Sequence, residues 1–292
     1  MQLIPIIYHN LPYPSGITTA NIKEVAAHFD IEKLNDSLEN YGFSLHTEYS
    51  AVKRKFTSDL IQSYPSILAS QSDSMRSKPK LWLDEKWAIE FADFLVKLLN
   101  GKIPRIIEIH PPNPRKFDVE RFLDYYELFT AHLSKFNLKT EISIENRNGF
   151  MLSGINDFQT LSDAIDRRNS DLRLILDFPQ LLNFEKAKSD QNKLIKAMDA
   201  INRFKHNVSS FHIWGQYGNN AHRGDLLDYF NQDKYMKNLF HEKLKEVFSD
   251  HPTPLYFIPE INFGIDENKS RQVCLKNIVD DLSSYGFQFM PY

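Results

Sequence analysis

Short apolar runs alternate with longer amphipathic stretches along most of the chain. The runs are rich in isoleucine, leucine, valine, phenylalanine and tyrosine, which is typical of buried β-strands. We therefore predict eight strands, at Leu3–Tyr8, Glu24–Phe29, Phe43–Glu48, Arg105–His110, Glu141–Glu145, Leu172–Asp177, Val208–Trp214 and Leu255–Glu260.

The stretches between these runs have the pattern of amphipathic helices. Asp118–Phe136 carries aromatic and leucine residues at helical spacing behind Asp118, a candidate N-cap, and Asn156–Arg168 and Asp190–Phe204 read the same way. Strands that alternate with helices favour parallel pairing and right-handed crossovers. Eight such units in 292 residues favour an α/β fold with one closed (β/α)8 TIM barrel rather than an open doubly wound sheet.

Two connections between the predicted strands are long. Tyr49–Pro104 contains the predicted helix Glu85–Leu99, so we expect a helical insertion at about residues 49–104 that serves as an interface or a lid. Gly215–Pro254 contains a Gly/Asn-rich segment before another helix. Neither has the composition of a domain linker, and we expect one domain over residues 1–292.

The composition is that of an ordinary globular protein. Lys+Arg 35 and Asp+Glu 38 give a net charge of −3, which argues against a protein that coats nucleic acid but leaves room for a local basic patch. Cys274 is the single cysteine, so an internal disulfide framework and a multi-cysteine metal site are excluded. The sequence has no run with the features of a signal peptide or a membrane span, and we expect a cytoplasmic protein with no membrane partner.

Histidine and carboxylate residues recur at the ends of the predicted strands. Successive side chains of a strand face opposite sides, so the large apolar residues define the side that faces the helices. The opposite side then points into the barrel. On this basis six residues face inward near the C-terminal strand ends, namely His46, His110, Glu145, Asp177, His212 and Glu260.

Taken singly, each of these residues has a simpler explanation. A lone strand histidine is more often a hydrogen-bonded core residue than a metal ligand, and a lone glutamate is usually a rim residue or a helix cap. Six such side chains at one barrel mouth would be unstable without a cation, because clustered carboxylates repel one another and buried charge is costly. We therefore expect one or two divalent ions per chain, zinc, manganese, iron or magnesium. Four other histidines are expected at the surface: His132, His206, His241 and His251.

The ordered set of strand-end motifs resembles the xylose-isomerase-like TIM barrels, the superfamily that contains endonuclease IV and the sugar isomerases and epimerases. The resemblance spans nearly the whole chain. It is carried by FSLHTEY, IIEIHPP, ISIENR, LILDFPQ, FHIWG followed by AHRGD, and FIPEIN, in the strand order of the family.

The resemblance implies metal ligands in two groups. Isomerases and epimerases hold one metal with Glu, Asp, His and Glu from strands five to eight, a quartet matched by Glu145, Asp177, His212 and Glu260. Endonuclease IV adds a metal on two histidines from the preceding strands, matched by His46 and His110, with the strand-five Glu bridging.

This sequence departs from the endonuclease pattern in the third metal position. Gln180 stands where endonuclease IV has a histidine three residues after the strand-six Asp. The Asp-x-His pair after strand seven is absent, with His222 and Asp225 as the nearest candidates. The sequence therefore favours a dinuclear over a trinuclear site.

Two metals suit hydrolysis of a phosphodiester, including one in nucleic acid, with Glu145 bridging and Glu260 or Asp177 orienting the attacking water. Loops leaving the same barrel end carry basic residues that can bind phosphates. These are Lys53, Arg54, Lys55, Arg115, Lys116, Arg147 and Arg223. We also assign Trp214, His222 and Asp225 to substrate binding, although Trp214 could simply fill the barrel.

Two other functions stay open. In a sugar or keto-acid isomerase or epimerase, Glu145 and Glu260 would exchange a proton next to a carbonyl polarised by a single metal, with His46 and His110 donating hydrogen bonds to substrate hydroxyls. A barrel that has lost catalysis and acts as a binding or assembly module is also compatible with the missing third-metal pattern. The sequence does not indicate an oligomeric state.

Overall fold

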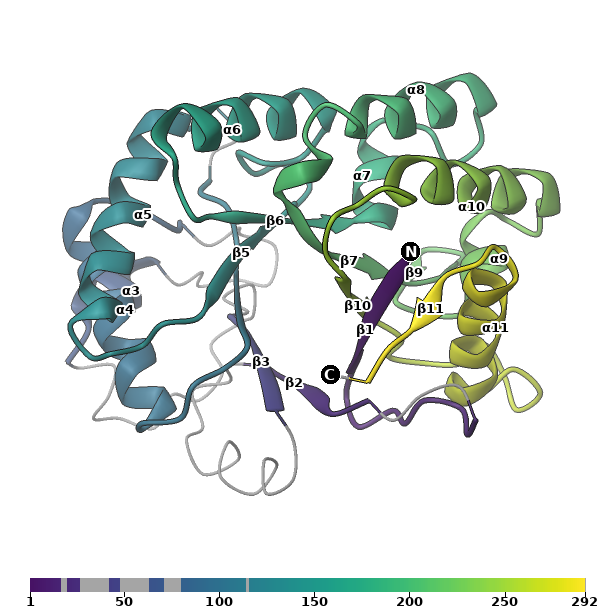
Figure 1. The fold of residues 1–292 in the computed structure, drawn as a ribbon, viewed down its shortest axis with the longest axis horizontal. Coiled ribbons are helices and arrows are strands. Elements are labelled where there is room, and N and C mark those ends of the chain that lie inside the picture. The colour runs from purple at the N-terminus through teal and green to yellow at the C-terminus, as the bar shows by residue number, and fades with distance from the viewer. Residues whose placement is uncertain (17–19, 27–41, 48–62, 71–79, 114–115, 292) are drawn as a thin grey trace.

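The computed structural model describes residues 1–16, 20–26, 42–47, 63–70, 80–113 and 116–291. Within these residues, parallel strands close into an eight-stranded barrel, because the order β10-β7-β6-β5-β4-β3-β2-β1 is completed by pairing of β1 with β10 (Figure 1). The strands are β1 (Gln2–Ile7), β2 (Ile22–Ala26), β3 (Gly42–His46), β4 (Ile106–Ile109), β5 (Glu141–Glu145), β6 (Arg173–Asp177), β7 (Val208–Ile213) and β10 (Leu255–Pro259). The predicted α/β TIM barrel is confirmed.

Helices follow the strands along the chain and surround the barrel (Figure 1). Asp118 and Asp190 accept hydrogen bonds from the first turns of their helices, as the sequence predicts, whereas the N-cap of α6 is Gly154 rather than Asn156. The described helices are α3 (Pro65–Ser70), α4 (Glu85–Leu99), α5 (Val119–Ser134), α6 (Ile155–Arg168), α7 (Phe178–Phe184), α8 (Gln191–Ile201), the 3₁₀ turn η1 (Lys205–Asn207), α9 (Leu226–Tyr229), α10 (Lys234–Phe248) and α11 (Arg271–Ser284).

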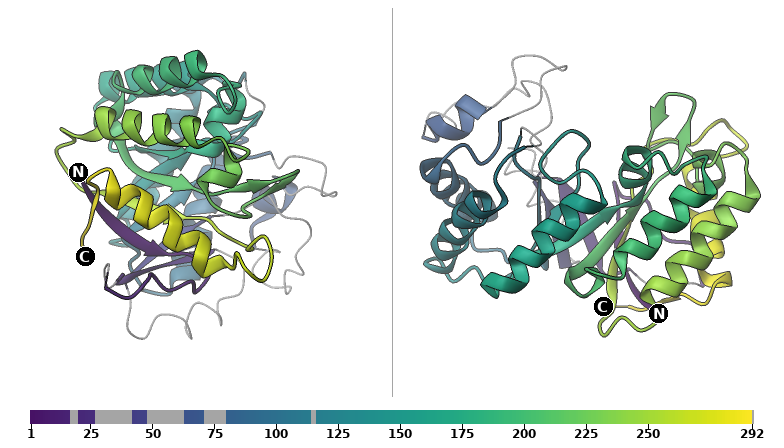
Figure 2. Two further views of the ribbon diagram at one scale, coloured as in Figure 1. Left: turned by 90° about the vertical axis from the view of Figure 1, so that its right-hand side faces the viewer. Right: turned by 90° about the horizontal axis from the view of Figure 1, so that it is seen from above.

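Three short strands complete the described structure. β8 (Gln216–Tyr217) and β9 (Asn220–Ala221) form an antiparallel hairpin after β7. β11 (Gln288–Phe289) pairs with β1, so the two ends of the chain lie next to each other, as the side views show (Figure 2). None of the described helices has the length and hydropathy to cross a bilayer.

The two faces of the strands belong to different cores. The large core lies between the outer face of the barrel and the helices. A small separate cluster consists of Ile6, Tyr8, Ile22 and Ile258, with Ile4 and Tyr256 packed against it. Its members from β1 and β10 recur at every second residue, and Ile22 begins β2, so the cluster lies on the inner face of the barrel. Glu260 follows Tyr256 and Ile258 at the same two-residue period and therefore continues this inward face.

Two sequence-based expectations need correction. The second strand begins at Ile22 rather than Glu24, and residues 27–29 lie outside the described part of the chain. The strand thus includes the polar Lys23, which pairs in register with Phe43 and is only partly buried. His241 is fully buried on α10, although we expected it at the surface. Its ring stacks on Tyr285 with centroids 5.1 Å apart.

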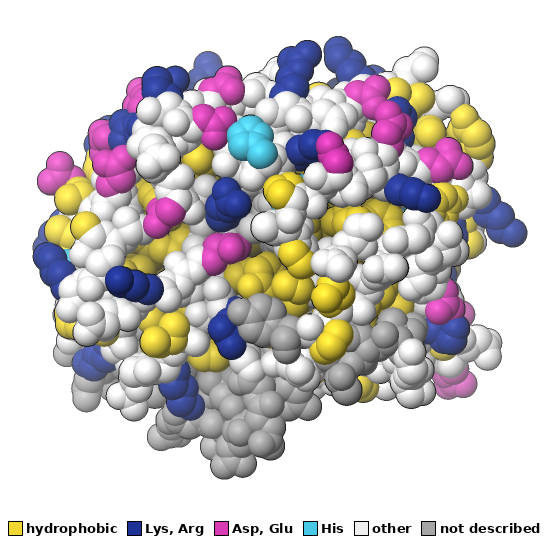
Figure 3. Space-filling model, viewed as in Figure 1, with side chains coloured by type: hydrophobic (Ala, Val, Ile, Leu, Met, Phe, Trp, Pro, Cys, Tyr) yellow, Lys and Arg dark blue, Asp and Glu magenta, His cyan; other side chains and the backbone are white. Residues whose placement is uncertain are grey.

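The described part of the connection from β3 to β4 is helical, with α3 and α4. Lys53, Arg54, Lys55 and Arg115, which the sequence offered as phosphate-binding residues, lie outside the described residues. On the face drawn in Figure 3, Lys and Arg side chains are interspersed with Asp and Glu. This mixed surface agrees with the near-neutral net charge of −3.

Candidate metal centre

The six predicted inward residues are all buried at one end of the barrel. Glu145 and Asp177 end β5 and β6, and His46 ends β3. The other three lie at or just beyond the ends of β4, β7 and β10, namely His110, His212 and Glu260. The C-terminal ends of the barrel strands therefore carry the site, as in other TIM barrels.

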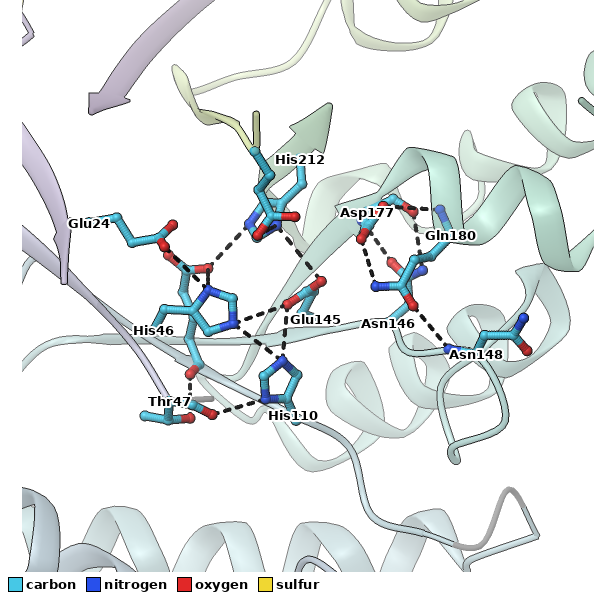
Figure 4. Close-up of polar contacts among 12 residues, drawn as sticks. Glu24, His46, Thr47, His110, Glu145, Asn146, Asn148, Asp177, Gln180 and His212 are labelled. Carbon is cyan, nitrogen blue, oxygen red and sulfur yellow. Dashed lines mark hydrogen bonds and ion pairs between the residues drawn. The ribbon is translucent and has the colours of Figure 1, made fainter. Parts of the chain in front are cut away.

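Glu145 lies at the centre of this group and one of its oxygens faces two imidazoles (Figure 4). Its Oε2 is 3.2 Å from Nε2 of His110 and 3.6 Å from Nε2 of His46. The two Nε2 atoms are 3.3 Å apart. Three potential ligand atoms from β3, β4 and β5 thus converge within 4.8 Å of one another.

The second oxygen of Glu145 faces a different set. Its Oε1 is 3.8 Å from Nδ1 of His212, and that nitrogen is 3.4 Å from Oε1 of Glu260. One carboxylate therefore lies between the His46–His110 pair and the His212–Glu260 pair.

The protonation of His110 is fixed by its surroundings. Its Nδ1 lies 2.9 Å from the carbonyl oxygen of Thr47. A carbonyl oxygen can only accept, so Nδ1 carries the proton and donates it to this bond. In the neutral ring Nε2 then has a free lone pair, and it points at Glu145. His110 is thus arranged as a metal ligand through Nε2.

The structure adds two carboxylates to the site that the sequence analysis did not assign to it. Glu24 Oε1 is 3.6 Å from Nδ1 of His46, and Glu108 Oε2 is 3.2 Å from Nε2 of His212. Glu108 shares the inward face with His110 two residues later, so strand alternation already placed it inside. Glu24 was not assigned to the site because its strand was predicted to begin at Glu24 rather than at Ile22.

Five buried carboxylates therefore surround three buried imidazoles: Glu24, Glu108, Glu145, Asp177 and Glu260 around His46, His110 and His212. Several of their polar atoms have no hydrogen-bond partner among the described residues, including both oxygens of Glu108, Oε2 of Glu145 and both ring nitrogens of His212. Burying this many acidic groups is costly unless a cation compensates them.

The pKa shifts reflect the same crowding. Burial alone would lower the pKa of His46, but Glu24, Glu108 and Glu145 raise it to about 10. Burial raises the pKa of Glu24 to about 7, against the opposing effect of His46. Burial, Glu145 and Glu260 raise the pKa of Asp177. These shifts all have one cause, which is that the crowded, buried carboxylates favour added positive charge at the site.

The chemistry of the donors fits a divalent metal. Imidazole nitrogens and carboxylate oxygens in one buried cluster are the ligands that zinc, manganese and iron share. Two groups have donor atoms close enough to surround an ion, namely His46 with His110 and Glu145, and Glu24 with His46 and Glu260.

Asp177 belongs to neither of these groups. It is the N-cap of α7, and its carboxylate accepts from the backbone N and the Nε2 of Gln180 at 3.0 and 2.7 Å. Nε1 of Trp214 donates to both oxygens of the same carboxylate. Asp177 therefore lies outside both groups, and its carboxyl is held by neighbouring side chains.

Among the predicted substrate-binding residues, His222 and Trp214 lie next to the cluster. Nδ1 of His222 is 3.4 Å from Oε2 of Glu260, and its ring lies over Trp214 with centroids 4.5 Å apart. Arg147 follows β5, and its guanidinium lies over the ring of Phe150, 5.4 Å from the centroid. The charge of Arg147 also reaches His110, whose pKa is lowered first by burial and then by this arginine.

The remaining two predicted substrate-binding residues have other partners. The guanidinium of Arg223 donates to the carbonyl oxygens of Gly264 and Ile265. Asp225 is the N-cap of α9, and its carboxylate contacts Lys269 at 2.9 Å and Asn277 at 2.7 Å. Both side chains thus hold the loop that carries His222.

Solved structures of other proteins have a fold similar to that of this chain. No protein-family model and no curated protein sequence matches the chain. The structure of an AP endonuclease, family 2, from Brucella melitensis superposes with a TM-score of 0.53 at 10% identity, covering 89% of this chain and 93% of that chain.

Two further solved structures cover nearly the whole chain. A xylose isomerase domain protein from Alicyclobacillus acidocaldarius has a TM-score of 0.49 at 11% identity and covers 98% of each chain. The IOLI protein with a binding zinc atom has a TM-score of 0.44 at 8% identity and covers 97% of this chain and 96% of that chain. The resemblance to the xylose-isomerase-like TIM barrels inferred from the sequence is confirmed as a likeness of fold.

Proposed function

We propose that the protein is a metal-dependent enzyme that hydrolyses phosphodiester bonds with two divalent cations. The observation that carries the proposal is the position of Glu145. Its Oε2 faces Nε2 of His46 and His110, and its Oε1 faces Nδ1 of His212. A carboxylate that presents one oxygen to each of two ligand sets is suited to bridge two cations.

The chain supplies the remaining ligands. His46 and His110 would hold one cation with Glu145, while His212 and Glu260 would hold the other, with Asp177 next to them. Two bound cations would supply a hydroxide nucleophile at neutral pH and stabilise charge on the leaving oxygen.

The chain's own groups would orient the reactants. Oε2 of Glu260 is turned toward His222 while its Oε1 faces His212, so this carboxylate can accept a proton from a water held at the rim. Arg147 is partly exposed, its charge acts on His110, and its guanidinium can pair with a phosphate through two parallel hydrogen bonds. Trp214 and His222 form a wall against which a sugar or base can pack.

One observation favours the second candidate, a single-metal sugar or keto-acid isomerase or epimerase. Nδ1 of His212 lies between Glu145 and Glu260, at 3.8 and 3.4 Å. Two carboxylates on either side of one ligand are also suited to exchange a proton at a carbon next to a carbonyl.

Cleavage of DNA with one abasic site, in the presence of zinc, manganese or magnesium, tests the proposal. Glu145→Gln should lower the rate by more than ~100-fold, because it removes the bridging charge. Glu141→Gln is the matched control, since Glu141 begins the same strand at the opposite end of the barrel and should retain full activity. No cleavage with any of the three metals, together with solvent deuterium entering a ketose or keto-acid, would establish the isomerase instead.

A further inference from the structure

We infer that Glu108 and Glu24 are positioning residues that, when a cation is bound, accept the N–H groups of the far nitrogens of His46 and His212 and thereby fix these two imidazoles in opposite tautomers. The inference rests on the proposed function, because it assigns a role to two carboxylates beside the proposed metal ligands. Neither carboxylate belongs to the ligand set that the sequence resemblance implies.

Glu108 reaches imidazoles on opposite sides of the barrel. Its strand, β4, is the neighbour of β3, and Glu108 pairs in register with His46. Its Oε2 is 3.9 Å from Nδ1 of His46 and 3.2 Å from Nε2 of His212. Because β3 and β7 are four positions apart in the closed eight-stranded order, this single oxygen connects side chains that face each other across the barrel.

Glu24 supports one of the two imidazoles from β2. Its Oε1 is 3.6 Å from Nδ1 of His46, the same nitrogen that faces Glu108. The carboxylate is buried, and its Oε2 has no hydrogen-bond partner among the described residues. Figure 4 shows Glu24 and Glu145 on opposite sides of the His46 ring.

Each imidazole therefore has a carboxylate at both nitrogens. His46 points Nε2 toward Glu145 and Nδ1 toward Glu24 and Glu108. His212 is reversed, with Nδ1 toward Glu145 and Glu260 and Nε2 toward Glu108. A neutral imidazole has one N–H and one lone pair, and an ionised carboxylate only accepts.

The tautomers follow from these contacts. If Glu108 and Glu24 accept the N–H groups, His46 is protonated at Nδ1 and His212 at Nε2, so that both lone pairs point toward Glu145. A carboxylate behind a ligating imidazole also makes the ligating nitrogen more basic and fixes the orientation of the ring. Glu108 would thus prepare ligands for both proposed cations at once.

The tautomers can be measured directly on the intact protein loaded with zinc. Long-range nitrogen–proton correlation spectra of protein labelled at histidine should show the proton of His46 on Nδ1 and that of His212 on Nε2. The same tautomer in both rings would overturn the inference. So would a His46 ring without a proton on Nδ1, since Glu24, His46 and Glu260 would then hold a cation of their own.

Zinc affinity gives a second readout that does not depend on activity. In competition with a chelator, Glu108→Gln should bind zinc ~10–100-fold more weakly, and Glu24→Gln should weaken only the cation held by His46. Glu90→Gln is the control, because Glu90 is a buried carboxylate on α4 that accepts from Ser66, far along the chain from the site, and its affinity should stay at the wild-type value.

The outcomes separate the two proposals. If the wild-type protein takes up no zinc, the proposed function fails and this inference fails with it. If the wild-type protein binds zinc and Glu108→Gln binds it equally tightly, the positioning role alone is overturned. Because the tautomer measurement uses the wild-type chain, it remains decisive even if Glu108→Gln does not fold.

Discussion

Trp214 donates its indole Nε1 proton to both carboxylate oxygens of Asp177, at 3.0 and 3.1 Å. The contact joins the end of β7 to the junction of β6 and α7, and both side chains are buried. Gln180 holds the same carboxylate from the first turn of α7. Trp214 is therefore a hydrogen-bond donor in the wall of the site as well as an apolar ring that fills it.

Replacement of this indole should destabilise the protein measurably. Trp214→Phe removes a hydrogen bond to a buried carboxylate, so we expect the free energy of unfolding to fall by about 2 kcal/mol beyond the loss of ring volume. Trp87→Phe is the control, because Trp87 is fully buried and its Nε1 has no hydrogen-bond partner among the described residues. Urea denaturation of both variants gives the difference, and equal losses would contradict the assigned role of the indole.

Lys269 should stabilise the loop that carries His222. Its Nζ lies 2.9 Å from Asp225 and 2.6 Å from Asp228, and both carboxylates are buried. Lys269→Met would leave two buried acids next to each other, at a cost of about 3 kcal/mol. Lys276→Met removes an exposed pair with Asp280 and should cost less than ~1 kcal/mol. Denaturation midpoints test this, and similar losses for the two variants would count against it.

The buried carboxyl of Glu24 should make a contribution to the stability of the metal-free protein that is lost as the pH rises from about 4.5 to about 7. Burial raises the pKa of Glu24 from 4.5 to about 7, in spite of His46. The folded state therefore keeps a proton that the unfolded chain has already released. This contribution is complete below pH 4.5 and is lost as the pH rises through 7, in total about 3 kcal/mol.

Asp177, whose pKa burial also raises, acts in the same direction. Buried His241 acts in the opposite direction, because burial lowers its pKa from 6.5 to about 4. The contribution of Glu24 is therefore the difference between the wild-type protein and Glu24→Gln, which unfolding measurements in the presence of a chelator at several pH values would give. A pH dependence that is the same in the wild-type protein and in Glu24→Gln would show that Glu24 is ionised in the folded metal-free protein.

Zinc should raise the melting temperature of the chelated protein. At about 1,000 times its dissociation constant a bound ion contributes ~4 kcal/mol, which corresponds to about 8 °C for a chain of this size. Calcium is the comparison, because it binds through oxygen ligands and could use only the carboxylates of the site, whereas zinc also binds imidazole nitrogens. Thermal unfolding followed by circular dichroism gives both shifts, and a shift with calcium as large as that with zinc would argue against imidazole ligation.

Strand alternation was enough to predict much of the site from the sequence. A strand side chain can face only two ways, so the apolar residues around His46, Glu145 and His212 determined that these three point inward. The same rule placed Glu108 inside, but its distance to His212 depends on the width of the barrel and on side-chain rotamers. No local pattern contains that information.

Other features depended on contacts between distant segments. The carboxylate of Asp177 is held by Trp214, 37 positions later in the chain, through a side-chain geometry that neither strand predicts. His241 could have been recognised as buried, because Phe240, Leu244 and Val247 give its helix face an apolar pattern and His241 lies within it. Its titratable ring counts as polar in a sequence pattern, and this favoured the prediction of a surface position.

The number of metal ions per chain tests the central claim most directly. Elemental analysis of the purified wild-type protein after loading with zinc and removal of free ions should give about two per chain, and Glu145→Gln should give fewer. One ion in the wild-type protein would contradict the bridging role of Glu145. No ion at all would contradict a metal centre at this end of the barrel.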